Sequence, residues 1–320
     1  MGLQPWLQNV GNINTPKSLF IQVMIFSFSS ISNLADNSFV RYFSTILKDF
    51  LINMLRTGPN PKHIAFIMDG NRRFSKRNNM KLADGHSKGA EVLFDVLTTA
   101  YQLDISHVTV YAFSIENFNR PQDEVDTLFG LLRDKLAVLA DNETSFAQVN
   151  HVKIKIIGNR SYIPDDILSQ LEDIERRTNK PDSHKVLNVC FPYTSRDDIT
   201  EAMRKVVSSL VSSDLQRQDL NEDVLQHQMY MDPNTPQLDI LIRTSGHTRL
   251  SDFMLWQCTA NCDIEFVETL WPEFGFFQFF QILVKWGWSK TAVAGWNTGR
   301  AKVYVYELPP APPLVSVIGR

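Results

Sequence analysis

The chain has 320 residues, of which 43% are hydrophobic and 21% are charged. A chain of this length can bury a large core, and its composition excludes the low hydrophobicity and high charge of a disordered protein. The 32 Lys and Arg residues nearly balance the 35 Asp and Glu residues, giving a formal net charge of −3. We therefore expect no nucleic acid partner, and any anion-binding site must be local.

Residues 1–37 surround an apolar stretch at 19–31 with Asn, Ser, Gln and Pro. This stretch is too short to cross a membrane as a helix. It has the length of a signal-peptide core, but no small-x-small cleavage site follows it, so we favour a chain that is not secreted.

An amphipathic helix is predicted from Phe39 to Leu55, because apolar residues recur there at helical spacing, and the run 58–61 (Gly-Pro-Asn-Pro) ends it. This helix either lies in a membrane interface or packs on the rest of the protein. We favour the membrane, since the apolar stretch before the helix would otherwise be exposed. Residues 1–60 are therefore predicted to associate with a membrane.

From residue 61 onward, short apolar β-branched runs alternate with longer segments of helical period. We expect strands at 63–68, 108–113, 152–157, 186–191, 238–242 and 264–267, and helices at 86–103, 122–140, 164–178, 196–213 and 221–231. This alternation predicts an α/β fold with a mostly parallel sheet flanked by helices on both faces. We expect one domain over 61–290 and a C-terminal tail over 291–320.

Polar clusters follow three of the expected strands, at 69–74, 114–121 and 243–252. Ligands of parallel sheets bind beyond the carboxyl ends of the strands, so these clusters are the candidate site. The clusters contain five arginines, Arg72, Arg73, Arg120, Arg243 and Arg249. These cations would repel one another at one sheet edge unless an anion lay among them.

The guanidinium group matches phosphate oxygens, and Gly70 and Gly246 would let backbone amides approach such an anion. Asp69, the carboxylate after the first strand, would then hold Mg²⁺ together with phosphate oxygens. A single arginine here would be better explained as a surface ion pair or helix cap, but three clusters favour a diphosphate or polyphosphate site. His86, beside Gly85 at a helix start, either contacts this phosphate or caps the helix.

Several other functions lack their motifs. The sequence contains no P-loop, no dinucleotide-binding G-x-G-x-x-G after a strand and no G-x-S-x-G elbow. The three cysteines, Cys190, Cys258 and Cys262, suit a reducing compartment. Cys258 and Cys262 could share a helical face, but no nearby His completes a zinc site, so we favour buried thiols.

Two of the expected helical segments, 90–101 and 125–139, are strongly apolar on one side. An ordinary core explains both, and we favour that interpretation. If they instead line a cleft beside the phosphate clusters, the substrate has a diphosphate head and a hydrocarbon tail.

Five ordered motifs across residues 60–288 resemble the cis-prenyltransferase family, which elongates isoprenoid diphosphates with Z geometry. The motifs are His63–Phe74 with Gly85-His86, Tyr111–Pro121, Cys190–Arg196, Leu241–Gln257 and Leu270–Phe274. The doubled Arg72-Arg73 and the N-terminal amphipathic helix resemble the eukaryotic dehydrodolichyl diphosphate synthase branch.

This resemblance implies a six-stranded, mostly parallel sheet with a hydrophobic substrate tunnel, and a catalytic domain at 61–290. It implies Mg²⁺-dependent extension of farnesyl diphosphate by isopentenyl diphosphate, to a polyprenyl diphosphate for dolichol synthesis and protein glycosylation. It places the protein peripherally at the endoplasmic reticulum membrane or on lipid droplets. The implied residues are Asp69 and Asn117 for catalysis, with Asp69 on the metal; Gly70, Asn71, Arg72, Arg73, His86 and Arg120 on the allylic diphosphate; Phe74 at the mouth; and Arg243, Arg249 and Ser251 on isopentenyl diphosphate.

The chain departs from the family pattern at four places. Leu82 stands where bacterial relatives carry an arginine, whose role is lost or passes to Lys81. The family's metal-assisting carboxylate has no clean counterpart, with Asp263 nearest and Glu265 the alternative, and Thr248 replaces a histidine. The chain ends at 317–320 without the family's Arg-x-Gly tail, which predicts a heteromer with a non-catalytic homologous subunit that supplies it.

Two rival functions remain. A trans-type prenyl synthase would use aspartate-rich helices, but Asp165-Asp166 and Asp197-Asp198 are better explained as helix starts. A non-catalytic partner subunit or membrane scaffold should lack Asp69 or the arginine clusters and keep the tail. The pattern here is the reverse.

Overall fold

The computed structural model describes residues 38–141 and 145–297, with side chains described over 44–141 and 145–291. The chain divides into two units between Gly58 and Pro59. The described part of the first unit holds helix α2, Ser38–Arg56, which confirms the predicted helix. No helix in the described ranges combines the length and apolarity needed to cross a membrane. The apolar stretch at 19–31 and the tail at 298–320 lie outside the described residues.

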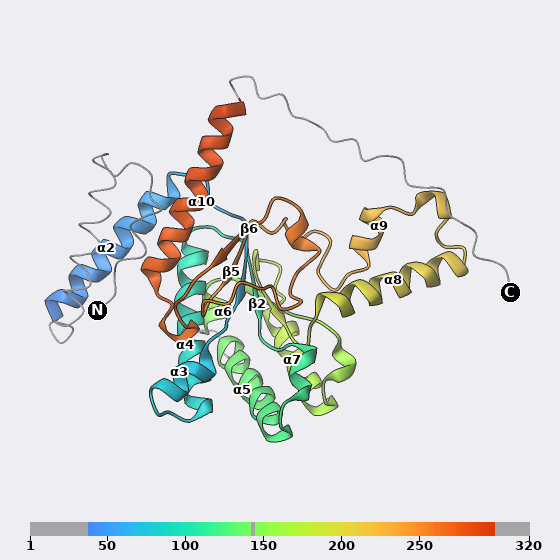
Figure 1. Cartoon of the computed structure of the whole chain (residues 1–320), viewed down its shortest axis with the longest axis horizontal. Helices are drawn as coiled ribbons and strands as arrows, with labels where there is room; N and C mark the ends of the chain where they lie inside the picture. The colour runs from blue at the N-terminus through green and yellow to red at the C-terminus, as the bar shows by residue number, and fades with distance from the viewer. Residues whose placement is uncertain (1–37, 142–144, 298–320) are drawn as a thin grey trace. The chain divides into compact units, whose positions relative to one another are not determined.

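The second unit is built on one six-stranded sheet, shown at the centre of Figure 1, in which every pair of neighbouring strands is parallel. The strand order is β3-β4-β2-β1-β5-β6. The strands are β1 His63–Ile67, β2 His107–Tyr111, β3 Val152–Ile157, β4 Lys185–Cys190, β5 Ile240–Arg243 and β6 Asp263–Phe266. The six predicted strands and the α/β class are confirmed, and β5 is displaced by one to two residues toward its carboxyl end.

Helices connect the strands. They are α3 Asn71–Arg77, α4 Leu82–Gln102, α5 Gln122–Ala140, α6 Phe146–Val149, α7 Asp165–Thr178, α8 Ser195–Val211, α9 Glu222–His227 and α10 Phe276–Asn297, with a 3-10 helix η3 at Ile115–Asn119. Thr194 caps α8 by accepting a hydrogen bond from the Asp197 amide. Asp197-Asp198 and Asp165-Asp166 occupy the first turns of α8 and α7, as predicted.

Some elements differ from the prediction. α3 was not expected, because its seven residues, NRRFSKR, are too charged and too few to show an apolar period. α10 was not expected either, since its aromatic residues are not confined to one side. α9 ends at His227, four residues early, because Met229 and Met231 turn into the core. Cys190 is buried, but Cys258 and Cys262 are only half-buried. Cys258 lies in a 3-10 helix, Gln257–Thr259, and Cys262 follows it, so the two do not share an α-helical face.

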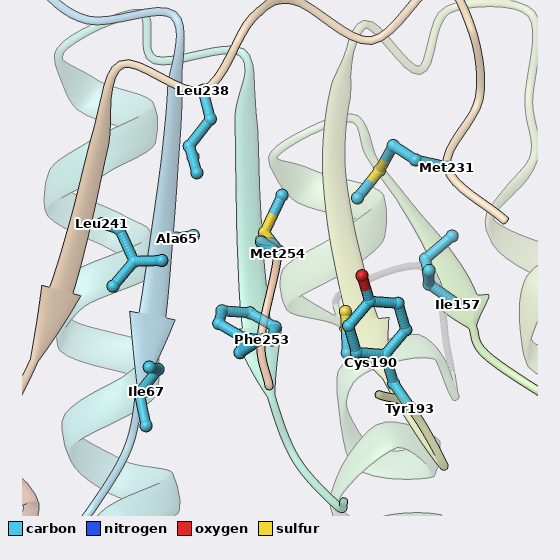
Figure 2. Packing of buried hydrophobic residues seen from close by; sticks show 10 residues of the cluster. All are labelled: Ala65, Ile67, Ile157, Cys190, Tyr193, Met231, Leu238, Leu241, Phe253 and Met254. Atoms are coloured by element: carbon cyan, nitrogen blue, oxygen red, sulfur yellow. The ribbon is translucent and has the colours of Figure 1, made fainter. Parts of the chain in front are cut away.

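The two faces of the sheet bury different clusters, because successive strand residues point to opposite sides. On one face Phe66 packs against the rings of Trp271, Phe274 and Phe279. On the other face, which Figure 2 shows, Ile67 belongs to a buried cluster with Phe253 and other residues from the loops around the sheet. The first face also carries the cavity described next.

Candidate active site

A cavity of about 630 Å³ lies between α4, α5 and one face of the sheet, and it extends to the carboxyl ends of β1, β2 and β5. The three predicted polar clusters all contribute to its lining, although they are far apart in the sequence. The residues predicted for catalysis and for binding the two diphosphates all line this cavity: Asp69, Gly70, Asn71, Arg72, Arg73, His86, Asn117, Arg120, Arg243, Arg249 and Ser251. The five arginines therefore meet at one cavity.

Arg243 is the centre of one side of this polar group. Its side chain is buried, and its Nη2 donates to Asp69 Oδ2 at 2.8 Å. Its Nη1 donates to Ser251 Oγ at 2.6 Å and to the Arg249 carbonyl. Arg243 thus joins the end of β1 to the loop that follows β5.

The charge of Asp69 is stabilised by these neighbours. Burial opposes ionisation of this carboxyl, but the hydrogen bond and the charge of Arg243 outweigh it, so the pKa of Asp69 lies below its usual value. The backbone is fixed as well, because Thr244 Oγ1 donates to the Asp69 carbonyl at 2.7 Å and accepts from the Asp69 amide at 3.1 Å. Asp69 is therefore a rigidly placed carboxylate, which suits a ligand of a hard cation.

α3 starts directly at the cavity. Gly70 precedes it with φ 114°, and a Cβ there would lie 3.0 Å from the Leu270 side chain, so both the conformation and the space favour glycine. The tight turn brings Asn71, Arg72 and Arg73 to the cavity wall. Arg73 Nη2 donates to the Ser245 carbonyl at 2.9 Å, which ties α3 to the loop after β5.

Arg72 and Arg120 approach the same carboxylate from two elements. Glu124 Oε1 lies 2.9 Å from Arg120 Nη1 and 3.9 Å from Arg72 Nη1. Burial and the nearby Arg72 charge lower the pKa of Arg120. One carboxylate against two guanidinium groups leaves excess positive charge at this side of the cavity, which an anionic ligand would neutralise.

Two buried polar atoms that α3 and α4 contribute to the lining, Asn71 Oδ1 and His86 Nε2, have no hydrogen-bond partner among the described residues, as is also true of Arg243 Nε on β5. His86 lies in the first turns of α4, and burial, followed by the Arg120 charge, lowers its pKa to about 4. At neutral pH His86 is an uncharged hydrogen-bonding group. Buried polar atoms without partners are uncommon, so both atoms point to a ligand in this cavity.

The donor set fits a metal only together with a phosphate ligand. Among the described residues, the carboxylates that line the cavity are Asp69 and Glu116, and no group of three or more His, Cys, Asp or Glu could hold a metal by itself. Mg²⁺ keeps several waters and binds through one or two carboxylates plus phosphate oxygens. Asp69 beside five arginines is compatible with that arrangement.

Most of the remaining lining is apolar. It comes from α4 and α5, from β2 and β4 and from the residues just after these strands, and includes Leu93, Leu97, Val110, Phe113, Leu128, Leu131, Leu132, Leu136, Leu139, Leu187, Val189 and Phe191. The two apolar helical segments therefore contribute both to the core and to the cavity lining, the two interpretations that the sequence left open. Val96, Tyr101 and Phe129 are buried core residues, whereas their neighbours line the cavity.

Some expectations for individual residues are wrong. Lys81 is exposed at the start of α4 and does not line the cavity, so it does not replace the arginine missing at Leu82. Asp263 begins β6, at the strand end away from the cavity, and Glu265 pairs with Lys285 at 2.7 Å. Phe74 does not line the cavity, because α3 turns its ring toward Arg77.

Other lining residues were not singled out from the sequence: Ser114, Glu116, Lys135 and His247. His247 lies one position before Thr248, within a polar cluster already identified, so its position was the available signal. Lys135 belongs to the segment of α5 that the sequence marked only by its apolar residues.

The undecaprenyl diphosphate synthase family model of prenyltransferases matches residues 67–293. The chain belongs to the cis-prenyltransferase family. It is 38% identical over 276 residues to dehydrodolichyl diphosphate synthase complex subunit SRT1 of Saccharomyces cerevisiae, covering 86% of this chain and 78% of that protein. It is 41% identical over 236 residues to the human dehydrodolichyl diphosphate synthase complex subunit DHDDS, covering 74% and 70% of the two chains.

Solved structures agree with this membership. The crystal structure of lavandulyl diphosphate synthase from Lavandula x intermedia, in complex with dimethylallyl diphosphate, superposes with a TM-score of 0.65 at 28% identity. That match covers 71% of this chain and 95% of the lavender chain. The six-stranded parallel sheet is therefore the fold shared with another cis-prenyltransferase relative, and the cavity lies in the part of the chain that the family match covers.

Proposed function

We propose that this cis-prenyltransferase is the catalytic subunit that extends farnesyl diphosphate by successive condensations with isopentenyl diphosphate. The product is a long-chain polyprenyl diphosphate for dolichol synthesis and protein glycosylation. One observation carries the proposal: a fixed carboxylate, five arginines and a long apolar lining meet in a single cavity. Such a cavity accommodates a charged diphosphate head and a hydrocarbon tail together.

The allylic diphosphate is assigned to the side of the cavity formed by α3, α4 and η3. Its ligands would be Gly70, Asn71, Arg72, Arg73, His86 and Arg120. Asp69 would hold Mg²⁺, and the bound metal would neutralise charge on the leaving diphosphate. The two unpartnered atoms, Asn71 Oδ1 and His86 Nε2, give this side polar groups that a hydrated diphosphate can satisfy.

Isopentenyl diphosphate is assigned to Arg243 at the end of β5 and to Arg249 and Ser251 in the loop that follows. In the reaction the allylic carbon–oxygen bond breaks and its electron pair leaves with diphosphate. A carbon–carbon bond then forms from the isopentenyl double bond, and the adjacent carbon loses a proton. Fixed guanidinium groups around the leaving group stabilise the charge that develops, and Asn117 lies where it can orient the reacting ends.

The growing chain is assigned to the apolar part of the cavity between α4 and α5. Each buried methylene contributes about 0.8 kcal/mol, so every added isoprene unit favours retention of the chain. This interpretation makes the leucines of α5 the wall against which the product extends.

A homologous, non-catalytic subunit is proposed as the partner. The yeast and human relatives are both named as complex subunits. The surface also offers a place for one, because Ile264 and Phe266 on the edge strand β6 are 38% and 40% exposed on the same side of the strand. Edge strands with exposed apolar residues are uncommon in isolated domains, so a second chain covering them is a physical explanation.

The membrane assignment rests on α2. Ile46, Phe50 and Met54 are spaced at i, i+4 and i+8 and share one side of this helix. We place the protein peripherally at the endoplasmic reticulum membrane or on lipid droplets, with this side in the lipid interface. In the full chain, Phe50→Asp should reduce flotation with anionic vesicles, and unchanged flotation would contradict the assignment.

The alternative is a non-catalytic subunit or scaffold of such a complex. Isopentenyl diphosphate incorporation, with farnesyl diphosphate and Mg²⁺, separates the two. Asp69→Ala should lower the rate at least about 100-fold, whereas Asp134→Ala on the exposed side of α5 should not. If the Asp69→Ala variant incorporates isopentenyl diphosphate at near the wild-type rate, the catalytic assignment is refuted. Robust turnover by the purified chain alone would refute the need for a partner.

A further inference from the structure

The loop after β5 contains backbone that is difficult to form without outside support. Ser251, Asp252 and Met254 have φ angles of 50°, 59° and 48°, in the left-handed region that residues other than glycine rarely adopt. Such conformations persist only when surrounding structure holds them. This loop carries Arg249 and Ser251, two of the residues assigned to isopentenyl diphosphate.

Part of that support comes from the core. Phe253 and Met254 are fully buried and extend into the cluster shown in Figure 2. The Phe253 ring stacks on Tyr111 with centroids 4.4 Å apart, and Tyr111 Oη donates to the Ser251 carbonyl at 3.3 Å. These contacts attach the middle of the loop to the core and to β2.

The start of α8 holds the same loop from outside. The Ser195 amide donates to the Asp252 carbonyl at 2.7 Å, and the Leu255 amide donates to Ser195 Oγ at 2.9 Å. Arg196 donates two hydrogen bonds to the Asp252 carboxylate, from its backbone amide to Oδ1 at 3.1 Å and from Nε to Oδ2 at 2.7 Å. The Asp252 side chain is only 9% exposed, whereas the Arg196 side chain is 72% exposed, so the carboxylate is the enclosed partner of this pair.

The same arginine also contacts the other wall of the cavity. Arg196 Nη2 donates to Glu116 Oε1 at 2.8 Å, and Glu116 precedes Asn117 in η3. Glu116 lines the cavity, but Arg196 does not. One guanidinium group therefore joins the wall that carries Asn117 to the loop that carries Arg249 and Ser251.

We infer that Arg196 is a positioning residue that fixes the isopentenyl diphosphate loop relative to the η3 wall. The inference rests on the proposed function, and it gives a role to the end of the Cys190–Arg196 motif. Arg196 acts through Asp252 and Ser251 on Arg243, whose Nη1 donates to Ser251 Oγ. The isopentenyl side should depend on Arg196 more than the allylic side does, since the 9% exposed Asp252 carboxylate receives two hydrogen bonds from Arg196, whereas the 61% exposed Glu116 receives one.

Steady-state kinetics of Arg196→Gln in the active complex test this role. We expect the KM for isopentenyl diphosphate to rise about tenfold, because the charge-assisted hydrogen bonds to Asp252 are lost. The KM for farnesyl diphosphate should change less than about twofold. Arg196→Lys, which keeps the charge, should recover part of the effect, and Asp252→Asn should reproduce it without further loss in the double variant.

Arg204→Gln is the matched control, because Arg204 lies on the same helix and pairs with Glu201 away from the cavity. Two results would overturn the positioning role. One is an unchanged KM for isopentenyl diphosphate in Arg196→Gln. The other is a rise in the KM values for both substrates together with a fall in melting temperature.

Hydrogen exchange gives a readout that does not depend on turnover. Protection of the Leu255 amide from exchange should fall most in Arg196→Gln and less in Arg196→Lys. It should stay constant in Arg204→Gln. Unchanged protection in Arg196→Gln would overturn the inference. If the wild-type complex converts neither substrate, the proposed function fails, but the exchange measurement still decides whether Arg196 holds the loop.

Discussion

Asp69 and Arg243, which are 174 positions apart in the sequence, form an ion pair of 2.8 Å at the carboxyl ends of two adjacent strands. The pairing of Ile67 with Arg243 in the β1–β5 register places these strand ends side by side. Arg243 is 3% exposed and Asp69 about one third exposed, so the carboxylate faces the cavity while its partner is held behind it. This pair sets the charge state of the proposed metal ligand.

The first prediction concerns the titration of Asp69. Arg243→Gln removes the hydrogen bond and charge that overcome burial, so the pKa of Asp69 should rise. In the wild type the lowered pKa of Asp69 stabilises the folded state at pH values above the pKa of the unfolded chain. This stabilisation is lost as the pH falls through the lower pKa of the folded state. The variant should lose this contribution. Carbon-13 NMR titration of the Asp69 carboxyl measures the shift.

Arg249→Gln serves as the control for that experiment. It removes one positive charge from the same cavity but leaves the Asp69–Arg243 contact in place. An Asp69 titration that moves equally in both variants would mean that the general field of the cavity, and not the specific pair, sets this pKa.

A second prediction follows from the close contact of α4 with the start of α3. A Cβ at Gly89 would lie 2.4 Å from Asn71 Oδ1 and 2.9 Å from Trp271 Cδ1. Gly89→Ala should therefore displace Asn71, raise the KM for farnesyl diphosphate and cost about 1–3 kcal/mol of stability. Kinetics and urea unfolding measure the two effects.

The control is Gly130→Ala on α5, where a new Cβ would meet only Arg133 Nη2, at 4.0 Å, besides the backbone of its own helix. Alanine favours helix, so this variant should be neutral or gain up to about 1 kcal/mol. If Gly89→Ala behaves like Gly130→Ala, the tight packing around Asn71 does not control the site.

A third prediction uses the buried carboxyl of Asp198. Burial raises its pKa to about 6, although the Tyr230 amide and Tyr193 hydroxyl donate to it at 2.8 and 3.2 Å. Between about pH 4 and 6 the folded state keeps this proton while the unfolded chain loses it. The stabilisation is therefore fully present at low pH and is lost as the pH rises through 6.

Asp198→Asn removes this pH dependence. The stability of the variant relative to the wild type should increase by up to about 3 kcal/mol between pH 4 and pH 7, as a shift of about two pKa units implies. Urea unfolding across this range measures it, with the exposed Asp214→Asn as the control. A difference that does not change with pH would show that Asp198 is ionised in the folded state throughout.

The fourth prediction concerns a polar contact across the sheet. Pro236 offers only a carbonyl to His63 Nδ1 at 2.9 Å, so Nδ1 carries the proton and Nε2 accepts from Thr109 Oγ1 at 2.7 Å. Asn188 Nδ2 also donates to Thr109 Oγ1, at 3.1 Å. Burial lowers the pKa of His63 to about 4, so the ring is neutral.

Thr109→Val keeps the shape but leaves His63 and Asn188 without this partner. We expect a loss of about 1–3 kcal/mol in the free energy of unfolding. Thr109→Ser, which keeps the hydroxyl, should lose less. Equal stabilities for the valine and serine variants, measured by urea unfolding, would contradict the proposed contact.

Some features followed from local pattern and were predictable. The strand runs are short, β-branched and apolar because both faces of a parallel sheet are buried, so all six were found. Helix starts at Asp165 and Asp197 were recognisable because acidic residues complement the helix dipole in the first turn. By contrast, α3 has no apolar period, and its course is set by Gly70 and the packing of α4.

The site divides in the same way. Local pattern was enough to predict a site of arginines, an aspartate and amides after three strands, because the carboxyl ends of parallel strands meet at one edge. The tertiary fold places Lys81 and Asp263 away from the cavity, whereas His247 and Glu116 line it. It also decided that Arg196, from a fourth motif, holds Asp252 and Glu116 together. Side-chain direction and long-range contacts depend on packing between distant segments, and no local spacing in the sequence records them.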